Sequence, residues 1–182
     1  MNLEESIVVI NANFSKDLIN RLIKYINYKA KSKLKVGSGL NTNIRNVNGY
    51  HLEKNSISDK IYFKHIMDMI HMFLKNYTIK FKHANVRQLN QVDLLKYTPG
   101  GKYEIHVDHD LLSQRTLTCI LNLNENYEGG DFIFFDPITN KEYKRVKCKT
   151  GTMIFFPSSF LFPHKVEPVT KGTRYSIVSW LI

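Results

Sequence analysis

A His-x-Asp pair near the middle of the chain is the feature best suited to chemistry. Residues 97–108 run through a Pro-Gly-Gly turn into a short predicted strand that carries His106 and Asp108. Because residues two apart on an extended strand point to the same face, both side chains can reach one ion. His164, which lies far along the chain at the start of another predicted strand, supplies a third ligand. The three residues therefore predict a metal site.

This donor set is typical of one kind of metal centre. Two histidines and one carboxylate on the same side of an ion form the facial triad of non-haem Fe(II) enzymes. The triad leaves three positions open, which suffice for a bidentate keto acid and dioxygen. Asp110 shares strand parity with His106 and Asp108 and could compete as a ligand, whereas His109 points the opposite way.

The last predicted strand carries an arginine toward the same interior. Alternation along residues 174–180 places Arg174, Ser176, Val178 and Trp180 on one face. An arginine aimed into an apolar interior is costly unless an anion meets it. A dicarboxylate cosubstrate would supply that anion. In 2-oxoglutarate oxygenases one carboxylate and the keto oxygen chelate the iron while the distal carboxylate accepts an ion pair from an arginine, the role open to Arg174 here, aided by a hydroxyl such as that of Ser176.

The second half of the chain must supply the frame for these residues. After residue 81 the sequence changes to short β-rich runs separated by turns roughly every 8 to 12 residues, which is typical of a sandwich or barrel. The fold class predicted is mainly β with flanking helices, namely a double-stranded β-helix (jelly roll). We predict its strands at residues 88–96, 103–108, 116–123, 131–135, 141–147, 151–156, 164–168 and 174–181.

The first half of the chain predicts two helices that support this frame. After a short strand at residues 6–10, Ser15 can cap the first helix, and Ser58 with Asp59 can cap a second that ends near Asn76. Residues 36–50 are rich in Gly and Asn and predict an irregular connecting loop, with a substrate lid as the less favoured role. Both helices should pack on one sheet, against the apolar set Leu117, Cys119, Leu121 and Leu123.

Length and composition agree with a single domain. We expect residues 1–182 to form one domain, with a helical support region over 1–87 and a jelly-roll catalytic core over 88–182. The two cysteines, Cys119 and Cys148, are interpreted as free thiols. No apolar run is long enough to span a bilayer, and the first residues are acidic where a secretory signal would be basic, so we expect a cytoplasmic protein without membrane contact.

The net charge of +10 is unevenly distributed. Up to residue 87 the chain has 15 Lys and Arg against 6 Asp and Glu, and after it 11 against 10. The excess could mark a surface that faces a polyanion. We favour compositional bias as the explanation, because Lys far outnumbers Arg and both Asn and Ile are abundant.

Five segments together resemble the prolyl 4-hydroxylase-like family of Fe(II)/2-oxoglutarate-dependent dioxygenases. The resemblance is dense from Leu89 to the C-terminus and lies in residues 97–108, 128–132, 151–156, 164–169 and 172–176. It implies that His106, Asp108 and His164 hold iron and that Arg174 binds the distal carboxylate of 2-oxoglutarate. It further implies that Tyr97 lines the cosubstrate pocket, that Trp180 lies at the mouth of the site, and that Arg115 faces the substrate.

Two further residues complete the candidate site. We assign Tyr103 to the substrate side and Asn122 to the 2-oxoglutarate side. Asn122 stands where some relatives place a tyrosine that also touches the distal carboxylate, so the hydrogen bonding there should differ.

The activity that the resemblance implies is hydroxylation of an unactivated C–H bond, with O2 and 2-oxoglutarate as cosubstrates and ascorbate as an activator by analogy. The favoured substrate is a prolyl or other residue of a peptide or protein, followed by a free amino acid or small molecule. The basic first half of the chain would favour a nucleic-acid demethylase. The pattern of such enzymes, however, has a second arginine at the position where this chain has Trp180. A non-enzymatic jelly-roll binding module would not need all three metal ligands.

Overall fold

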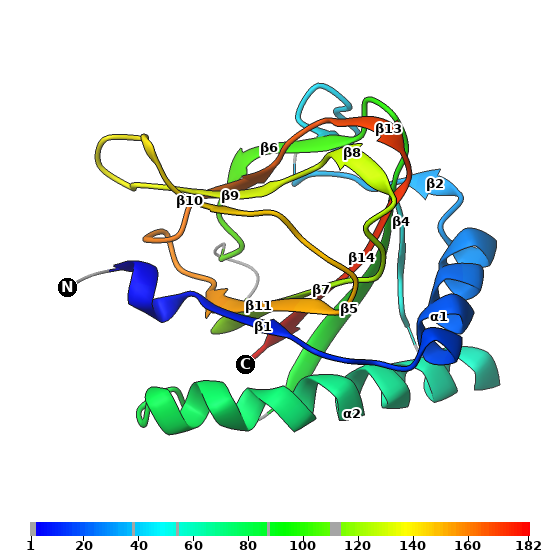
Figure 1. Ribbon diagram of the computed structural model, residues 1–182, viewed down its shortest axis with the longest axis horizontal. Helices are drawn as coiled ribbons and strands as arrows, with labels where there is room; N and C mark the ends of the chain where they lie inside the picture. The colour runs from blue at the N-terminus through cyan, green and yellow to red at the C-terminus, as the bar shows by residue number, and fades with distance from the viewer. Residues whose placement is uncertain (1–2, 38, 54, 87, 110–113) are drawn as a thin grey trace.

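The computed structural model describes residues 3–37, 39–53, 55–86, 88–109 and 114–182, and these form a double-stranded β-helix with helices along one side (Figure 1). Among these residues, seven strands make the larger sheet, and every neighbouring pair in it is antiparallel. In spatial order the strands are β1 (Val8–Asn11), β11 (Thr152–Pro157), β7 (Leu117–Asn122), β14 (Arg174–Leu181), β5 (Leu89–Tyr97), β4 (Asn48–His51) and β2 (Ser32–Lys33).

A smaller sheet faces the larger one and carries most of the candidate metal ligands. Its strands, in order, are β10 (Glu142–Val146), β9 (Phe132–Phe135), β12 (His164–Val166), β6 (Lys102–His106) and β3 (Arg45–Asn46). A short ribbon of β8 (Tyr127–Gly129) and β13 (Val169–Gly172) joins its end. One apolar cluster contains inward side chains of both sheets, among them Phe132 and Phe134 from the smaller and Phe156 and Trp180 from the larger.

The two α-helices of the described ranges cover the outer face of the larger sheet. They are α1 (Lys16–Lys29) and α2 (Ile57–Lys80), and a single turn of 3₁₀-helix, η1 (Leu3–Ser6), precedes β1. The predicted surface for them is confirmed, because Leu117, Cys119, Leu121 and Leu123 are buried in one cluster with residues of both helices. Neither helix has the combination of length and apolar character that crossing a membrane would require.

Helix α2 begins earlier and ends later than the sequence predicted. Its N-cap is Ser56 rather than Ser58, because the Ser56 hydroxyl accepts from the backbone N–H of Asp59 at 3.0 Å and the Asp59 carboxylate accepts from the backbone N–H of Ser56 at 3.3 Å. This reciprocal pair satisfies two backbone donors at once, which a cap at Ser58 cannot do. The helix continues past Asn76 because Tyr77 is still buried in the core.

All eight predicted strands are present, as β5, β6, β7, β9, β10, β11, β12 and β14. The prediction of irregular structure over residues 36–50 is wrong in its second half, where β3 and β4 form. β3 lies at the edge of the smaller sheet, paired to β6, and β4 lies between β5 and the two-residue edge strand β2. Each pairs with a longer neighbouring strand, so their own residues need not alternate.

A buried carboxylate fastens α2 to α1 and to β4. Asp59 is 1% exposed and accepts hydrogen bonds from the hydroxyls of Tyr25 and Tyr50, while Lys29 Nζ lies 3.1 Å from Oδ1. Burial alone would raise the pKa of Asp59, but hydrogen bonds from Tyr25, Ser56 and Lys29 outweigh it and lower the pKa to about 2. The charged form therefore stabilises the junction of the three elements.

We predict that Asp59→Asn lowers the free energy of unfolding by about 2 kcal/mol at pH 7. Because the folded-state pKa lies below the unfolded value, this contribution is complete above about pH 4 and is lost as the pH falls toward 2. Urea unfolding of both proteins at pH 7 and pH 3 measures the difference. Asp17→Asn, in the exposed first turn of α1, is the control and should change little. A difference that stays constant between the two pH values would contradict the prediction.

Candidate metal centre

The two candidate histidine ligands are brought together by strand pairing. His106 is the last residue of β6 and His164 the first of β12, and they are direct partners in this antiparallel pair. Their ring centroids are 4.3 Å apart. Asp108 follows two residues after His106 in a bend, so the predicted strand ends earlier than expected, although the carboxylate still turns toward the histidines.

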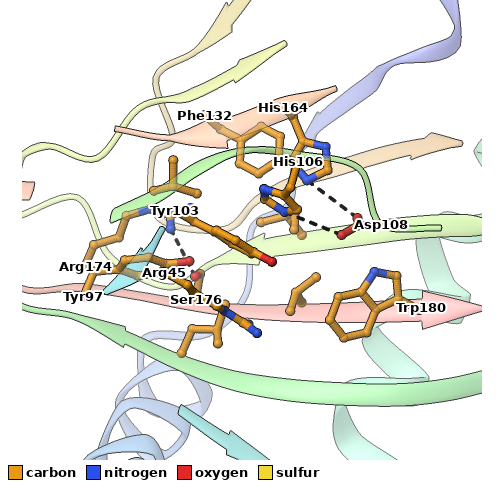
Figure 2. A pocket seen from close by; sticks show the side chains of 14 residues that line it. Arg45, Tyr97, Tyr103, His106, Asp108, Phe132, His164, Arg174, Ser176 and Trp180 are labelled. Atoms are coloured by element: carbon orange, nitrogen blue, oxygen red, sulfur yellow. Dashed lines mark hydrogen bonds and ion pairs between the residues drawn. The ribbon is translucent and has the colours of Figure 1, made fainter. Parts of the chain in front are cut away.

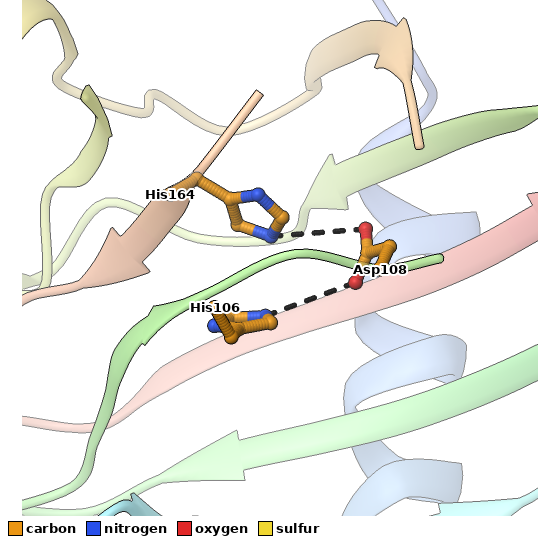
Figure 3. A group of neighbouring side chains, drawn as sticks. All are labelled: His106, Asp108 and His164. Atoms are coloured by element: carbon orange, nitrogen blue, oxygen red, sulfur yellow. Dashed lines mark ion pairs between the residues drawn. The ribbon is translucent and has the colours of Figure 1, made fainter. Parts of the chain in front are cut away.

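The three side chains converge on one point (Figure 3). Nε2 of His106 lies 3.7 Å from Oδ1 of Asp108, and Nε2 of His164 lies 3.7 Å from Oδ2. One ligand atom from each residue falls within 4.8 Å of the other two. Asp108 and His164 are buried and His106 is largely so. Three converging donors at this spacing can hold a single cation.

Backbone carbonyls fix the orientation of both imidazoles. Nδ1 of His106 lies 2.8 Å from the carbonyl oxygen of Glu104, and Nδ1 of His164 lies 3.0 Å from that of Phe162. Since a carbonyl can only accept, each Nδ1 carries a hydrogen, which leaves each Nε2 as the ring nitrogen that faces the centre. Such hydrogen bonds are the usual means by which proteins orient histidines that bind metals.

The carboxylate is held as firmly as the histidines. The Thr118 hydroxyl donates to Oδ2 of Asp108 at 2.6 Å and lies 2.8 Å from the Ser158 hydroxyl. The backbone at the bend is fixed by Arg115, whose Nη1 donates to the carbonyl oxygen of Asp108 at 3.0 Å. These contacts determine where the ligand oxygens point.

Electrostatics favour the protonation states that bind metal. Burial, followed by the nearby His164, lowers the pKa of His106 to about 3, so this imidazole is neutral at physiological pH. Burial acts to raise the pKa of Asp108, but His164 and His106 outweigh it and the net shift is downward. A neutral imidazole and an ionised carboxylate are the forms that coordinate a cation.

A buried arginine lies in the same pocket as the three ligands (Figure 2). Arg174 is 1% exposed, is paired in register with Tyr97, and its guanidinium carbon lies 5.2 Å from the centre of the Tyr97 ring. Nη1 donates to the Ser176 hydroxyl at 3.2 Å, but Nε and Nη2 have no hydrogen-bond partner among the described residues. Unpaired buried donors on a cation favour the binding of an anion.

The residues present fit a first-row divalent metal together with an anionic ligand. Two imidazole nitrogens and one carboxylate oxygen match the facial triad of non-haem Fe(II) sites, which leaves the opposite face open. Arg174, whose Nε and Nη2 have no partner among the described residues, lines the same pocket. The pocket can therefore hold an ion that binds one end of a dicarboxylate while the arginine binds the other.

Most of the residues predicted for the site line this one pocket. They are Tyr97, Tyr103, His106, Asp108, His164, Arg174, Ser176 and Trp180. Tyr103 stacks on His106 with ring centroids 3.5 Å apart, and Phe132 stacks on His164 at 5.0 Å. These rings restrict both histidines to one orientation.

Two predicted residues lie outside the pocket, and their assigned roles stay predictions. Arg115 lines the adjoining groove, with its guanidinium carbon 3.8 Å from the centre of the Trp180 ring. Asn122 is buried behind the pocket, where its amide donates to the carbonyls of Asn124 at 2.5 Å and Lys149 at 3.2 Å and its Oδ1 accepts from Tyr127. Of the alternative ligands, His109 is exposed, and Asp110 is outside the described residues.

The sequence did not reveal three residues that shape the site. Arg45 on β3 is 8% exposed, and its guanidinium carbon lies 4.8 Å from the centre of the Tyr103 ring. It occurs in an Asn-rich and Gly-rich tract with no periodic pattern, so nothing in the sequence distinguishes it. Thr118 could have been identified from the sequence, because it is a polar residue at an inward position of an apolar strand. Ser158 follows the predicted strand, and no sequence pattern distinguishes it.

The comparisons with known proteins point to one family. The profile of the 2OG-Fe(II) oxygenase superfamily matches residues 92–182. A PKHD-type hydroxylase of Herminiimonas arsenicoxydans is 42% identical over 96 residues, which cover 47% of this chain and 40% of that protein. Another, of Gloeothece citriformis, is 33% identical over 101 residues, covering 52% and 44%. The chain therefore spans less than half the length of these relatives.

Solved structures agree with the fold. A prolyl-4-hydroxylase of Pseudomonas putida superposes with a TM-score of 0.75 at 19% identity, covering 97% of this chain and 92% of that one. A prolyl hydroxylase of Trichoplax adhaerens, in complex with a peptide fragment of hypoxia inducible factor, superposes with a TM-score of 0.76 at 17% identity, covering 97% and 83%. At such low identity these likenesses establish a shared fold.

We predict that His106→Ala and His164→Ala each abolish tight binding of Fe(II) or its redox-stable substitute Mn(II). A triad that loses one ligand retains only two donors, whereas His109→Ala keeps all three and should bind as the wild type does. Calorimetric titration with Mn(II) measures affinity, and the rise in melting temperature on metal addition gives an independent readout. Equal Mn(II) affinity in all four proteins would refute the metal site.

We further predict that Thr118→Val weakens Mn(II) binding by about tenfold or more without unfolding the protein. Valine keeps the shape of threonine but removes the hydroxyl that orients Oδ2 of Asp108. Thr116→Val, two residues earlier and exposed, is the matched control. If both variants bind Mn(II) equally well, the Thr118 hydrogen bond does not support the centre.

Proposed function

The chain belongs to the 2OG-Fe(II) oxygenase superfamily, and on this premise we propose that it couples hydroxylation of a C–H bond to the oxidative decarboxylation of 2-oxoglutarate. The observation that carries the proposal is the joint presence, in one pocket, of three converging metal donors and a buried arginine with unpaired donors. A folded core alone does not account for Arg174, because it leaves two buried donors of a cation without a partner among the described residues.

The chain's residues divide the work between the two ends of the pocket. His106, Asp108 and His164 would hold Fe(II) by one face. When bound, the iron supplies the oxidising chemistry that O2 and 2-oxoglutarate make available. Arg174 would bind the distal carboxylate of 2-oxoglutarate through its unpaired Nε and Nη2, with the Ser176 hydroxyl beside it.

Apolar side chains would keep the reacting end of the pocket dry. Leu95, Ile120 and Val178 line it from the larger sheet, and Phe132 lines it from the smaller one. Tyr97 lies under the guanidinium of Arg174 and limits the orientations available to it. Exclusion of water strengthens the ion pair to the cosubstrate and protects a strongly oxidising centre from side reactions.

For the substrate, we propose a prolyl or other residue of a peptide or protein. The similarity to proteins named PKHD-type hydroxylases and to prolyl hydroxylase structures supports this choice. A groove lined by Tyr103, Arg115 and Trp180 adjoins the metal pocket and offers room for an extended chain. A free amino acid is the alternative within the same reaction class.

We predict that the anaerobically prepared protein with Fe(II) converts labelled 2-oxoglutarate to succinate on exposure to O2, and that Asp108→Ala abolishes the conversion. Arg174→Gln should raise the KM for 2-oxoglutarate by about tenfold to a hundredfold, because a charge-assisted bidentate contact is lost. The same variant should melt no lower than the wild type without 2-oxoglutarate, because it removes an uncompensated buried charge.

His109→Ala is the control for this experiment and should retain wild-type turnover. Succinate formation that survives Asp108→Ala would refute the assigned metal centre. An unchanged KM in Arg174→Gln would refute the assigned cosubstrate site while leaving the reaction class standing.

A further inference from the structure

A groove with an excess of basic side chains adjoins the metal pocket. We call it the outer groove; the lining residues that matter here are Lys35, Arg45, His51, Asp93, Arg115 and Trp180. Among the described residues that line it, the carboxylates are Asp93 and Asp108, and Asp108 is assigned to the metal centre. A hydrogen bond with Asp93 raises the pKa of His51, which favours the charged imidazole. The groove is therefore positively charged beside the place where a substrate must lie.

Arg45 is the residue that links this groove to the metal pocket. It lines both cavities, is 8% exposed, and lies over the face of the Tyr103 ring (Figure 2). Tyr103 in turn stacks on the metal-ligand candidate His106. A group bound to Arg45 would therefore be close to the carbon that reacts.

The buried carboxylate of Asp93 does not satisfy all the hydrogen-bond donors of Arg45. Asp93 is already bonded through Oδ1 to His51 at 2.6 Å and to Gln91 at 2.9 Å. Arg45 reaches the other oxygen only at 3.7 Å, which is longer than a hydrogen bond. Its Nη1 donates to the carbonyl of Lys35 at 3.2 Å, and its Nε has no partner among the described residues. Asp93 thus orients Arg45 and leaves it able to bind a second anion.

We propose that Arg45 binds a carboxylate of the substrate, so that this enzyme prefers substrates with an acidic group next to the hydroxylated carbon. The inference rests on the proposed function and adds a substrate class to it. Arg174 does not serve this purpose, because the proposed function assigns it to the distal carboxylate of 2-oxoglutarate. Two buried arginines from different sheets would then each bind one anion: Arg174 the carboxylate of the cosubstrate and Arg45 that of the substrate.

Trp180 provides a direct test, because it is the only tryptophan of the chain and lines the outer groove. The full chain, loaded anaerobically with Mn(II) and 2-oxoglutarate, is titrated with amide-capped peptides while tryptophan fluorescence is recorded. The peptides are acetyl-Glu-Pro-Gly-amide and acetyl-Gly-Pro-Glu-amide, each with a Gln and a Lys counterpart. Acetyl-Gly-Pro with a free carboxyl end distinguishes a terminal carboxylate from an acidic side chain.

At least one carboxylate-bearing peptide should bind about tenfold more tightly than its neutral counterpart, and the Lys peptides should bind most weakly. Arg45→Gln should remove this preference, Arg45→Lys should retain part of it, and Arg21→Gln, on the exposed face of α1, should leave it unchanged. The KM for 2-oxoglutarate should be the same in Arg45→Gln and the wild type.

Equal affinities for acidic and neutral peptides would overturn the proposal, as would an Arg45→Gln variant that weakens every peptide alike or raises the KM for 2-oxoglutarate. Should Arg45→Gln fail to fold, Arg45→Lys decides the matter, because it keeps the charge but loses the planar, bidentate donor geometry. A preference for acidic peptides that is as large in Arg45→Lys as in the wild type would then overturn the proposal. The fluorescence titration needs no turnover, so a failure to form succinate would refute the proposed function alone.

Discussion

The pairing of His164 with His106 across β12 and β6 is the contact on which the rest of the site depends. A shift of one residue in this register would turn one imidazole to the opposite face of the sheet, and no movement of Asp108 could compensate. Each histidine is also oriented locally, by the carbonyl of the residue two positions before it, Glu104 for one and Phe162 for the other. The ladder of backbone hydrogen bonds thus sets the position of the two ligands, and the local backbone sets the orientation of their rings.

Against this ordered frame, the interior carries two buried guanidinium groups whose donors are not all satisfied. Arg174 is almost fully buried with two unpaired donor groups, and Arg45 is nearly as buried with one. An unsatisfied buried donor costs stability, and for Arg45 the ion pair with Asp93 at 3.7 Å offsets part of this cost. Both arginines line a space bounded by apolar and aromatic side chains, where the electrostatic attraction for an anion is strong. The pocket is in this sense preorganised for ligands that bring negative charge.

The sequence revealed those parts of the site that follow from strand alternation. Ser176 and Trp180 share a face with Arg174, and His106 approaches Asp108, because side chains two apart point the same way. The sequence did not predict structure that depends on pairing with another strand. β3 is two residues long and forms through its pairing with β6, so Arg45 was not recognised as a site residue. The cap of α2 was misplaced for a related reason, since Ser56 and Ser58 are equally suitable alone and only the contact with Asp59 distinguishes them.

The positions of these side chains in the sequence suggest that one part of the chain carries the chemistry and another part determines which substrates bind. The profile match covers residues 92–182, which contain the three metal-ligand candidates and Arg174. The side chains that give the outer groove much of its positive charge, Lys35, Arg45 and His51, come from before that match. Arg45 reaches the metal pocket only because β3 pairs with β6, which places Arg45 directly opposite Tyr103. A strand added at the edge of a sheet can thus change which substrates are accepted without moving a metal ligand, because the frame holding the triad lies on the other side of β6.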